Sequence, residues 1–294
     1  MNRILITGGA GFIGSRLSIR LINKGYTVTV LDNLSEQIHG EDPETTSELF
    51  QSIRDKVTFI NGSVVDKDCL RNAIEGQDAI VHLAAETGTG QSMYAIDKYV
   101  EVNIGGTAKL LDILTNQEHQ VKKVVVASSR AIYGEGKYVD SDGKVYYPSQ
   151  RNQEDMDTGY FELKAGENAL FPVATDEESR IHPSSLYGIS KYNQEQMIMT
   201  LCPAIGVHPV ALRYQNVYGP GQSLRNPYTG ILSIFSTKIR NGNDIVIFED
   251  GKESRDFVYI DDIVSATVSA LEMDEANGQV YNVGTGVPTD VITV

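Results

Sequence analysis

The sequence predicts an α/β fold built on one parallel β-sheet, because short strand-like runs of apolar residues alternate with amphipathic helical stretches. The strand-like runs lie at 2–7, 27–31, 57–60, 79–83, 123–127, 209–213 and 280–283. Helical periodicity occupies 12–22, 67–75, 97–117 and 187–201. Because parallel strands joined by helices need right-handed crossovers, we expect a doubly wound, Rossmann-type sheet.

The first elements follow in order from the N-terminus. A strand at 2–7 ends in a glycine-rich turn, a helix then runs to Gly25, and the second strand ends at Asp32. The acidic segment 35–55 predicts a loop with a short helix. The segment 135–183 lacks periodicity and predicts an insertion with a structure of its own.

The C-terminal part departs from this alternation. From about residue 218 glycine, proline and asparagine become frequent, which indicates a smaller, mixed domain over the carboxyl edge of the sheet. We expect 1–183 to form the Rossmann domain, with the insertion at about 135–183. Residues 184–294 would hold the remaining Rossmann elements, interleaved with this second domain.

Composition and charge narrow the class of protein. The 294 residues are 41% apolar and 22% charged, which is enough apolar material for a large core. Asp and Glu number 39 against 25 for Lys and Arg, so the net charge is −14. Nucleic acids and anionic membranes bind cationic faces, so we expect neither as a partner. Local Arg, Lys or backbone N–H groups must hold any anionic ligand.

Patterns of secreted, metal-binding and membrane proteins are not found in the sequence. Cys69 and Cys202 cannot build a disulfide framework, and the five histidines are scattered singly, so we expect no metal site. No signal peptide opens the chain, and no apolar run is long enough to span a bilayer. We therefore expect a cytoplasmic protein.

The glycine-rich turn after the first strand predicts a dinucleotide site. Residues 7–14 read Thr-Gly-Gly-Ala-Gly-Phe-Ile-Gly, and glycine allows the backbone to approach a pyrophosphate that the helix N-terminus binds. Asp32 can accept hydrogen bonds from an adenosine ribose and would repel a 2′-phosphate. This favours NAD over NADP. The alternative is a structural glycine turn beside a solvated Asp32.

A second set of residues predicts acid–base chemistry at the same sheet edge. Tyr187 and Lys191 stand four residues apart, on one face of a helix. Ser129 directly follows the fifth strand, at the edge where such sheets bind ligands. A Tyr-x-x-x-Lys pair alone is also common by chance as a surface pair, so its place beside Ser129 matters.

Six ordered motifs extend over nearly the whole chain. They are Gly8-Gly9-Ala10-Gly11-Phe12-Ile13-Gly14, His82-Leu83-Ala84-Ala85, Asn103-x-x-Gly106-Thr107, Ser128-Ser129 with Tyr133-Gly134, Tyr187-x-x-x-Lys191 and Arg213-Tyr214-x-Asn216-Val217-Tyr218-Gly219-Pro220. With them the chain resembles the extended short-chain dehydrogenase/reductase family, specifically its nucleotide-sugar epimerases and dehydratases. The resemblance implies a bound NAD, a nucleotide-sugar substrate and a homodimer.

The resemblance also implies roles for individual residues. Tyr187 would be the base, Ser129 would orient the reacting hydroxyl, and Lys191 would bind the nicotinamide ribose. A phenolate near neutral pH needs its pKa lowered by about 3 units, which Lys191 and the nicotinamide would supply. Implied cofactor contacts are Gly8, Gly11, Phe12, Ile13, Gly14, Asp32, Asn33, Ser63, Val64, Leu83, Ala84, Ala85, Asn103, Tyr187, Lys191 and Tyr214. Implied substrate contacts are Thr87, Ser129, Asn216, Arg225, Phe248 and Arg255.

The residues after Ser129 bear on the reaction. Dehydratases of the family carry an Asp-Glu pair there, and this chain has Arg130 and Ala131. Without an elimination step, C4 is oxidised to a ketone, the ketone turns over, and the hydride returns to its opposite face. The net reaction is epimerisation at C4. Segments 84–94 and 222–230 are similar to those of bacterial dTDP-L-rhamnose 4-epimerases, which make dTDP-6-deoxy-L-talose. Alternatives are a UDP-glucose or other UDP-hexose 4-epimerase, a dehydrogenase or reductase that releases its cofactor, and a non-catalytic NAD-binding protein.

Several features depart from the family pattern. Ser63 replaces the Asp that holds adenine, and 163–166 lacks the Cys-x-x-Cys knuckle of some relatives. The chain ends where relatives continue, so we expect a truncated substrate domain. A homodimer would form through the helices near 97–117 and 187–201. Apolar residues expected to be exposed there are Ile104, Leu110, Met197 and Met199.

Overall fold

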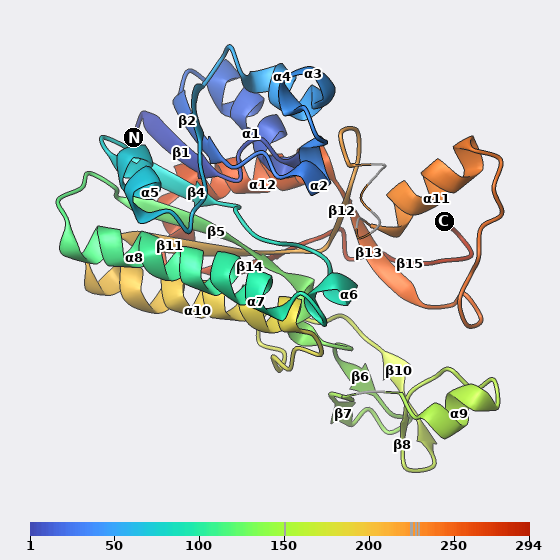
Figure 1. The fold of residues 1–294 in the computed structure, drawn as a ribbon. Helices are drawn as coiled ribbons and strands as arrows, with labels where there is room; N and C mark the ends of the chain where they lie inside the picture. Colours follow the sequence, from blue (N-terminus) through green and yellow to red (C-terminus); the bar gives the residue numbers. More distant parts are fainter. Residues whose placement is uncertain (150, 224–225, 227, 229) are drawn as a thin grey trace.

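The computed structural model describes residues 1–149, 151–223, 226, 228 and 230–294 and shows a seven-stranded parallel sheet (Figure 1). Its strands lie in the order β14-β11-β5-β4-β1-β2-β3. They are β1 (Arg3–Thr7), β2 (Thr27–Asp32), β3 (Thr58–Asn61), β4 (Ala79–His82), β5 (Lys123–Ser129), β11 (His208–Tyr214) and β14 (Val280–Val283). Every neighbouring pair is parallel. The predicted doubly wound Rossmann-type fold is confirmed.

Helices cover both faces of this sheet, and the pleat of the strands divides the core in two. In β1, Ile4 and Ile6 belong to one apolar cluster and Leu5 to the other. The first cluster is completed by α1 (Phe12–Asn23) and α12 (Ile260–Glu272). The second is completed by α5 (Lys67–Ile74), α8 (Gly106–Asn116) and α10 (Leu186–Ala204). The five inner strands β1, β2, β4, β5 and β11 thus bury both of their faces, as expected inside a parallel sheet, whereas the edge strands β3 and β14 are partly exposed.

One expectation about exposed residues on these helices is wrong. Leu110 is fully buried in the second apolar cluster, because the face of α8 that carries it turns toward the sheet. Ile104, Met197 and Met199 are half-buried, and the two methionines pack against the same cluster. A helix-period pattern alone does not tell which stripe of a helix faces the core.

The predicted helix at 97–117 contains a change of winding. It consists of α7 (Ile96–Tyr99), a π-helical turn η1 (Val100–Gly105) and α8. Asn103, in the π-helical turn, is fully buried and accepts a hydrogen bond from the Glu86 backbone N–H at 2.7 Å. Its amide group also donates to the Glu86 carbonyl at 3.1 Å and to Ser190 Oγ at 2.9 Å. The turn therefore fixes the loop after β4 against α10.

The acidic segment 35–55 holds more helix than the sequence predicts. It folds as α2 (Glu36–His39), α3 (Pro43–Thr46) and α4 (Glu48–Ile53). Ser47 caps α4 by accepting a hydrogen bond from the Phe50 N–H at 3.2 Å. These short helices lie over the end of β2, beside the N-terminus of α1 (Figure 1).

The insertion at 135–183 projects from the body of the molecule (Figure 1). One small antiparallel sheet joins β6 (Tyr138–Val139), β7 (Val145–Tyr146) and β10 (Phe171–Pro172), and a second joins β8 (Lys164–Ala165) and β9 (Asn168–Ala169). A short helix, α9 (Gln153–Asp157), lies between them in the chain. The insertion therefore has secondary structure of its own.

A second peripheral region lies beyond the carboxyl ends of the sheet strands. It holds β12 (Asn216–Tyr218), β13 (Ser254–Tyr259) and β15 (Pro288–Asp290), which form one small sheet, and α11 (Ile231–Arg240). The chain leaves this region to add α12 and β14 to the main body and then returns to it (Figure 1). The shorter elements α6 (Thr89–Ser92), η2 (Arg130–Tyr133) and η3 (Asp274–Ala276) complete the fold. In the described part of the chain, no helix has the length and apolar character needed to cross a bilayer.

Candidate active site

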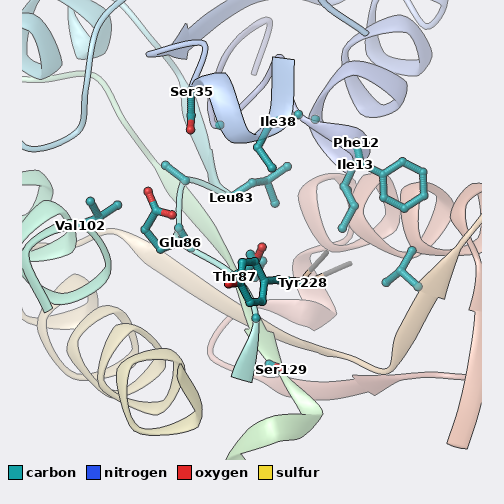
Figure 2. Close-up of a pocket in the computed structure, with 18 of the residues that line it drawn as sticks. Phe12, Ile13, Ser35, Ile38, Leu83, Glu86, Thr87, Val102, Ser129 and Tyr228 are labelled. Carbon is teal, nitrogen blue, oxygen red and sulfur yellow. The ribbon is translucent and has the colours of Figure 1, made fainter. Parts of the chain in front are cut away.

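A cavity of about 530 Å³ lies at the carboxyl ends of β1, β2, β4 and β5 (Figure 2). β1 lies between β4 and β2, where the winding of the sheet reverses and such folds bind their ligands. Most of the predicted contact residues line this cavity. They are Gly8, Gly11, Phe12, Ile13, Gly14, Asp32, Asn33, Ser63, Val64, Leu83, Ala84, Ala85, Thr87, Ser129, Tyr187, Lys191, Tyr214 and Asn216.

The glycine-rich turn brings the backbone to the floor of the cavity. Gly8 has a φ of +70°, and a Cβ there would lie 2.8 Å from the backbone nitrogen of Ala84. Gly11 is the N-cap of α1 and has no side chain with which to cap it, so the first N–H groups of the helix stay available to an anion. The turn therefore has the form of a pyrophosphate cradle.

Asp32 faces this cradle from the end of β2. Its carboxylate accepts hydrogen bonds from the Ala10 N–H at 3.0 Å and the Leu34 N–H at 2.9 Å. Burial raises the pKa of Asp32, while those hydrogen bonds and the nearby His39 oppose the rise. The fixed carboxylate, the glycine turn and the uncapped helix together fit the adenosine half of NAD.

Sequence reasoning missed His39, which lines the same part of the cavity. Its Nε2 lies 3.9 Å from the Asp32 carboxylate, and its Nδ1 is 2.7 Å from Ser47 Oγ. Burial lowers the pKa of His39. The sequence predicts segment 35–55 as a loop with a short helix. That pattern does not indicate that α2 and α4 bring the His39 side chain beside Asp32.

Ser129 and Tyr187 meet at the other part of the cavity. Ser129 ends β5 and Tyr187 lies in the first turn of α10, and the Ser129 side chain is close enough to the Tyr187 phenol to lower its pKa. The two elements approach closely because residue 188 is glycine: a Cβ at Gly188 would lie 2.5 Å from the Ala131 carbonyl oxygen. Ser185 caps the helix here by accepting from the Gly188 N–H at 3.1 Å.

The charges around Tyr187 differ from the expectation. Burial raises the pKa of Tyr187, whereas the hydrogen bond with Ser129 and the positive charge of Arg130 lower it. Lys191 donates to Gln194 Oε1 at 2.7 Å, and burial lowers the pKa of Lys191 to about 7. Arg130, which the sequence marked only as a departure from the dehydratase pattern, is thus a cation that acts on Tyr187.

Behind Lys191, buried polar side chains form a connected network. Gln194 Nε2 donates to Thr107 Oγ1 at 2.9 Å, and Thr107 lies 3.0 Å from His82 Nε2. His82 Nδ1 lies 2.8 Å from Thr7 Oγ1 at the end of β1. Burial lowers the pKa of His82 to about 3, so His82 is neutral at ordinary pH.

A smaller cavity of about 130 Å³ adjoins the main one and shares Asn216, Val217, Gln222 and Gly230 with it. Arg255 lines this cavity, pairs with Glu253 and donates to the Ser254 carbonyl at 2.9 Å. Asn216 donates to the Asp256 carbonyl at 3.2 Å. The structure thus places Arg255 next to, rather than inside, the main cavity.

Two predicted contacts lie elsewhere, and a third belongs to a residue that the structure does not describe. Asn103 is buried behind the cavity wall, because its amide holds Glu86 and Ser190. Phe248 is 82% exposed and lines neither of these two cavities. Arg225 lies outside the described residues. Within the described ranges, no group of three or more His, Cys, Asp or Glu residues is placed to hold a metal ion.

Comparison with known proteins identifies the family. The model of the NAD dependent epimerase/dehydratase family matches residues 4–153 and 165–284. The dTDP-L-rhamnose 4-epimerase of Burkholderia thailandensis is 37% identical over 293 residues, covering 99% of this chain and 78% of the relative. A putative UDP-glucose 4-epimerase of Methanocaldococcus jannaschii is 33% identical, covering 98% of this chain and 78% of the relative.

Solved structures agree with the sequence relatives. The UDP-glucose 4-epimerase of Thermotoga maritima, with UDP-glucose, has a TM-score of 0.77 at 31% identity and covers 99% of this chain and 79% of its own. The UDP-glucuronic acid 4-epimerase of Bacillus cereus, in complex with UDP-glucuronic acid and NAD, has a TM-score of 0.77 at 27% identity, covering 99% and 80%. The glycine turn, Asp32 and the neighbouring Ser129 and Tyr187 are therefore parts of a protein that belongs to the NAD-dependent epimerase/dehydratase family.

Proposed function

We propose that the protein is an NAD-dependent nucleotide-sugar 4-epimerase. The observation that carries this proposal is a single cavity whose lining contains both a dinucleotide cradle and the side chains of Ser129, Tyr187 and Lys191. When bound, NAD accepts a hydride from C4 of the sugar and returns it. The chain must then hold the sugar hydroxyl and move its proton.

The residues divide that work as follows. Tyr187 takes the proton of the C4 hydroxyl and gives it back after the ketone has turned over. Ser129 binds the same hydroxyl and orients it. Lys191 binds the nicotinamide ribose, and Asp32 binds the adenosine ribose through the carboxylate that Ala10 and Leu34 fix.

The side chains after Ser129 favour epimerisation over elimination. Loss of water needs an acid at the leaving hydroxyl and a base at the neighbouring carbon. Arg130 and Ala131 stand in these positions and line the cavity, and neither is a carboxylic acid. Reversible oxidation at C4, without a further step, follows from that set of residues.

For the substrate we propose dTDP-L-rhamnose, which would be converted to dTDP-6-deoxy-L-talose for polysaccharide biosynthesis. The relative in Burkholderia thailandensis supports this choice by its name and its identity. UDP-glucose is the second candidate, supported by the relatives and solved structures that bear its name. Thr87, Asn216 and Arg255 would contact the nucleotide sugar, and Arg255 would bind its diphosphate.

We also propose that the protein is a cytoplasmic homodimer. Its contact would use the outer face of α7, η1 and α10, where Ile96, Val100, Ile189 and Leu201 are exposed. Size-exclusion chromatography with light scattering tests this: a dimer is expected, and a shift to monomer in an Ile189→Asp variant. A monomeric parent would contradict it.

The activity is tested with purified protein and no added NAD. Incubation with dTDP-L-rhamnose, and separately with UDP-glucose, is followed by proton NMR of the C4 configuration. Conversion of either sugar, abolished in Tyr187→Phe, is expected and would also show that NAD is retained. If neither converts even after NAD is added, the 4-epimerase proposal fails for these sugars, and a non-catalytic NAD-binding protein becomes the better account.

A further inference from the structure

Arg130 places an unpaired positive charge in the wall of the main cavity. It directly follows Ser129, begins η2 and lines the cavity. Among the residues that the structure describes, its guanidinium has neither a hydrogen-bond partner nor an ion-pair partner. Arg213 shows the usual arrangement of a buried arginine, since it donates to the Glu195 carboxylate at 2.6 Å and 3.1 Å.

Four ionisable groups act on the charge of Arg130, which lines the main cavity. They are Arg255, Glu253, Glu135 and Tyr187. Burial and the like charge of Arg255 lower the pKa of Arg130 to about 10, so Arg130 remains positively charged at neutral pH. The guanidinium therefore lies within the electrostatic reach of both the catalytic phenol and the arginine of the adjoining cavity.

The same neighbourhood is short of positive charge for a diphosphate. Arg255 is paired with Glu253, and Glu135 also faces the group, in a chain whose net charge is −14. The diphosphate of a nucleotide sugar brings two further negative charges. An arginine without a protein partner can meet phosphate oxygens with two parallel N–H donors, which a paired one cannot do without giving up its partner.

We propose that Arg130 is a second anchor for the diphosphate of the nucleotide sugar and holds the phosphate that carries the sugar. The assignment rests on the proposed function, since only a nucleotide sugar joins a reacting C4 hydroxyl to a diphosphate through one hexose ring. Tyr187 and Ser129 meet one side of the ring, and Arg130 meets the phosphate on the other. Arg255 then holds the remainder of the diphosphate.

The test compares nucleotides that differ by one phosphate. NAD-loaded parent protein and the variants Arg130→Gln and Arg130→Lys are titrated calorimetrically with dTDP and dTMP, and with UDP and UMP. Arg20→Gln, an exposed arginine on α1, is the matched control for loss of one charge. Melting curves and bound NAD content show whether each variant is folded and loaded.

Loss of one charged hydrogen-bond donor pair is expected to weaken dTDP and UDP binding roughly ten- to hundred-fold in Arg130→Gln. Binding of dTMP and UMP should change far less, because they lack the phosphate that carries the sugar. Arg130→Lys should recover part of the loss, since it keeps the charge without the planar fork. Arg20→Gln should bind all four nucleotides like the parent.

Two outcomes would overturn the assignment. One is that Arg130→Gln binds dTDP and UDP with an affinity within about twofold of the parent. This holds even if the variant binds the complete nucleotide sugar less tightly. The other is an equal loss for mono- and diphosphates. Binding is measured without turnover, so the two proposals can fail separately. If the parent binds dTDP but converts no sugar, the 4-epimerase proposal is contradicted, and the role of Arg130 in diphosphate binding can still be judged. A parent that binds no diphosphate contradicts both.

Discussion

Tyr187 has to lose a proton in a place where burial opposes a negative charge. Its pKa is raised by burial, and the neighbours that counteract this are the Ser129 hydroxyl and the Arg130 guanidinium. A base with a raised pKa is mostly protonated at neutral pH, so turnover should rise with pH until the phenol ionises. Binding of the positively charged nicotinamide ring should move that rise to lower pH.

The residue-level prediction concerns Tyr187→Phe. Removing the phenolic oxygen should lower kcat by about 10²–10⁴-fold, because general base catalysis is lost, while KM and bound NAD change little. Tyr192→Phe, on the same helix and half-buried, is the matched control and should keep the parental rate. Initial rates for the sugar that the parent converts give the measurement. A Tyr187→Phe enzyme of near-parental rate would remove Tyr187 from the reaction.

A second residue-level prediction concerns the stability cost of Lys191. Burial lowers its pKa from 10.5 to about 7, so the fold disfavours the charged form. In the absence of NAD, stability should therefore fall as the pH drops from about 10.5 toward 7, because the unfolded chain binds a proton that the native chain does not. Below pH 7 both states bind it, and the loss stays constant.

Lys191→Met should accordingly be more stable than the parent at pH 7, by roughly 1–4 kcal/mol, while losing activity. Thermal unfolding of NAD-free protein at pH 7 and pH 9.5 measures the difference, which should shrink at the higher pH. Lys67→Met, whose side chain is exposed at the start of α5, controls for loss of a surface charge. A Lys191→Met protein that is less stable at both pH values would show that the charge costs nothing.

At the scale of elements, the π-helical turn between α7 and α8 sets the shape of the cavity wall. A π-helical turn shifts the winding by one residue and often marks a functional position. Here it turns Asn103 inward, where its amide holds the backbone of Glu86 and the side chain of Ser190. The loop after β4, with Thr87 in the cavity wall, is thereby tied to the helix that carries Tyr187.

Asn103→Ala should break these ties. We expect a loss of about 1–3 kcal/mol of unfolding free energy, because the Glu86 backbone groups and Ser190 lose their partner in a buried place. KM for the nucleotide sugar should rise more than kcat falls, since the loop holds the proposed substrate contact Thr87 and not the proposed base. Asn116→Ala, exposed at the end of α8, is the control. Denaturant unfolding and steady-state kinetics measure these effects. The prediction would be contradicted if both variants had the unfolding free energy, KM and kcat of the parent.

At the scale of the whole molecule, one cavity is built from residues far apart in the chain. Its lining extends from Gly8 to Gly230 and draws on the glycine turn, the short helices after β2, the loop after β4 and α10. A ligand that fills this cavity contacts the native state alone, so it should stabilise the fold as a unit.

NAD at about 100 times its Kd should therefore stabilise NAD-stripped protein by about 2.7 kcal/mol. Asp32→Ala should lose most of this gain at the same NAD concentration, because it removes the acceptor for the ribose hydroxyls. Asp55→Ala, at an exposed position after α4, should keep it. Differential scanning calorimetry with and without NAD measures the stabilisation of each protein. If NAD left the Tm of the parent unchanged, the cavity would not bind NAD.

Prediction from the sequence worked where the controlling interactions are local. The glycine turn, Asp32 at a strand end and the spacing of Tyr187 and Lys191 follow from turn chemistry and helical periodicity. It failed where tertiary packing decides. Leu110 turned out buried, because its neighbours in the sequence do not fix which face of the helix meets the sheet.

The neutral state of His82 bears on where protons can be held behind Lys191. The network from Lys191 through Gln194 and Thr107 reaches His82, whose pKa of about 3 keeps it from becoming charged in any physiological medium. It ends at Thr7, which is completely buried at the end of β1. Behind Lys191 there is therefore no imidazole that would hold, at neutral pH, a proton taken from the sugar.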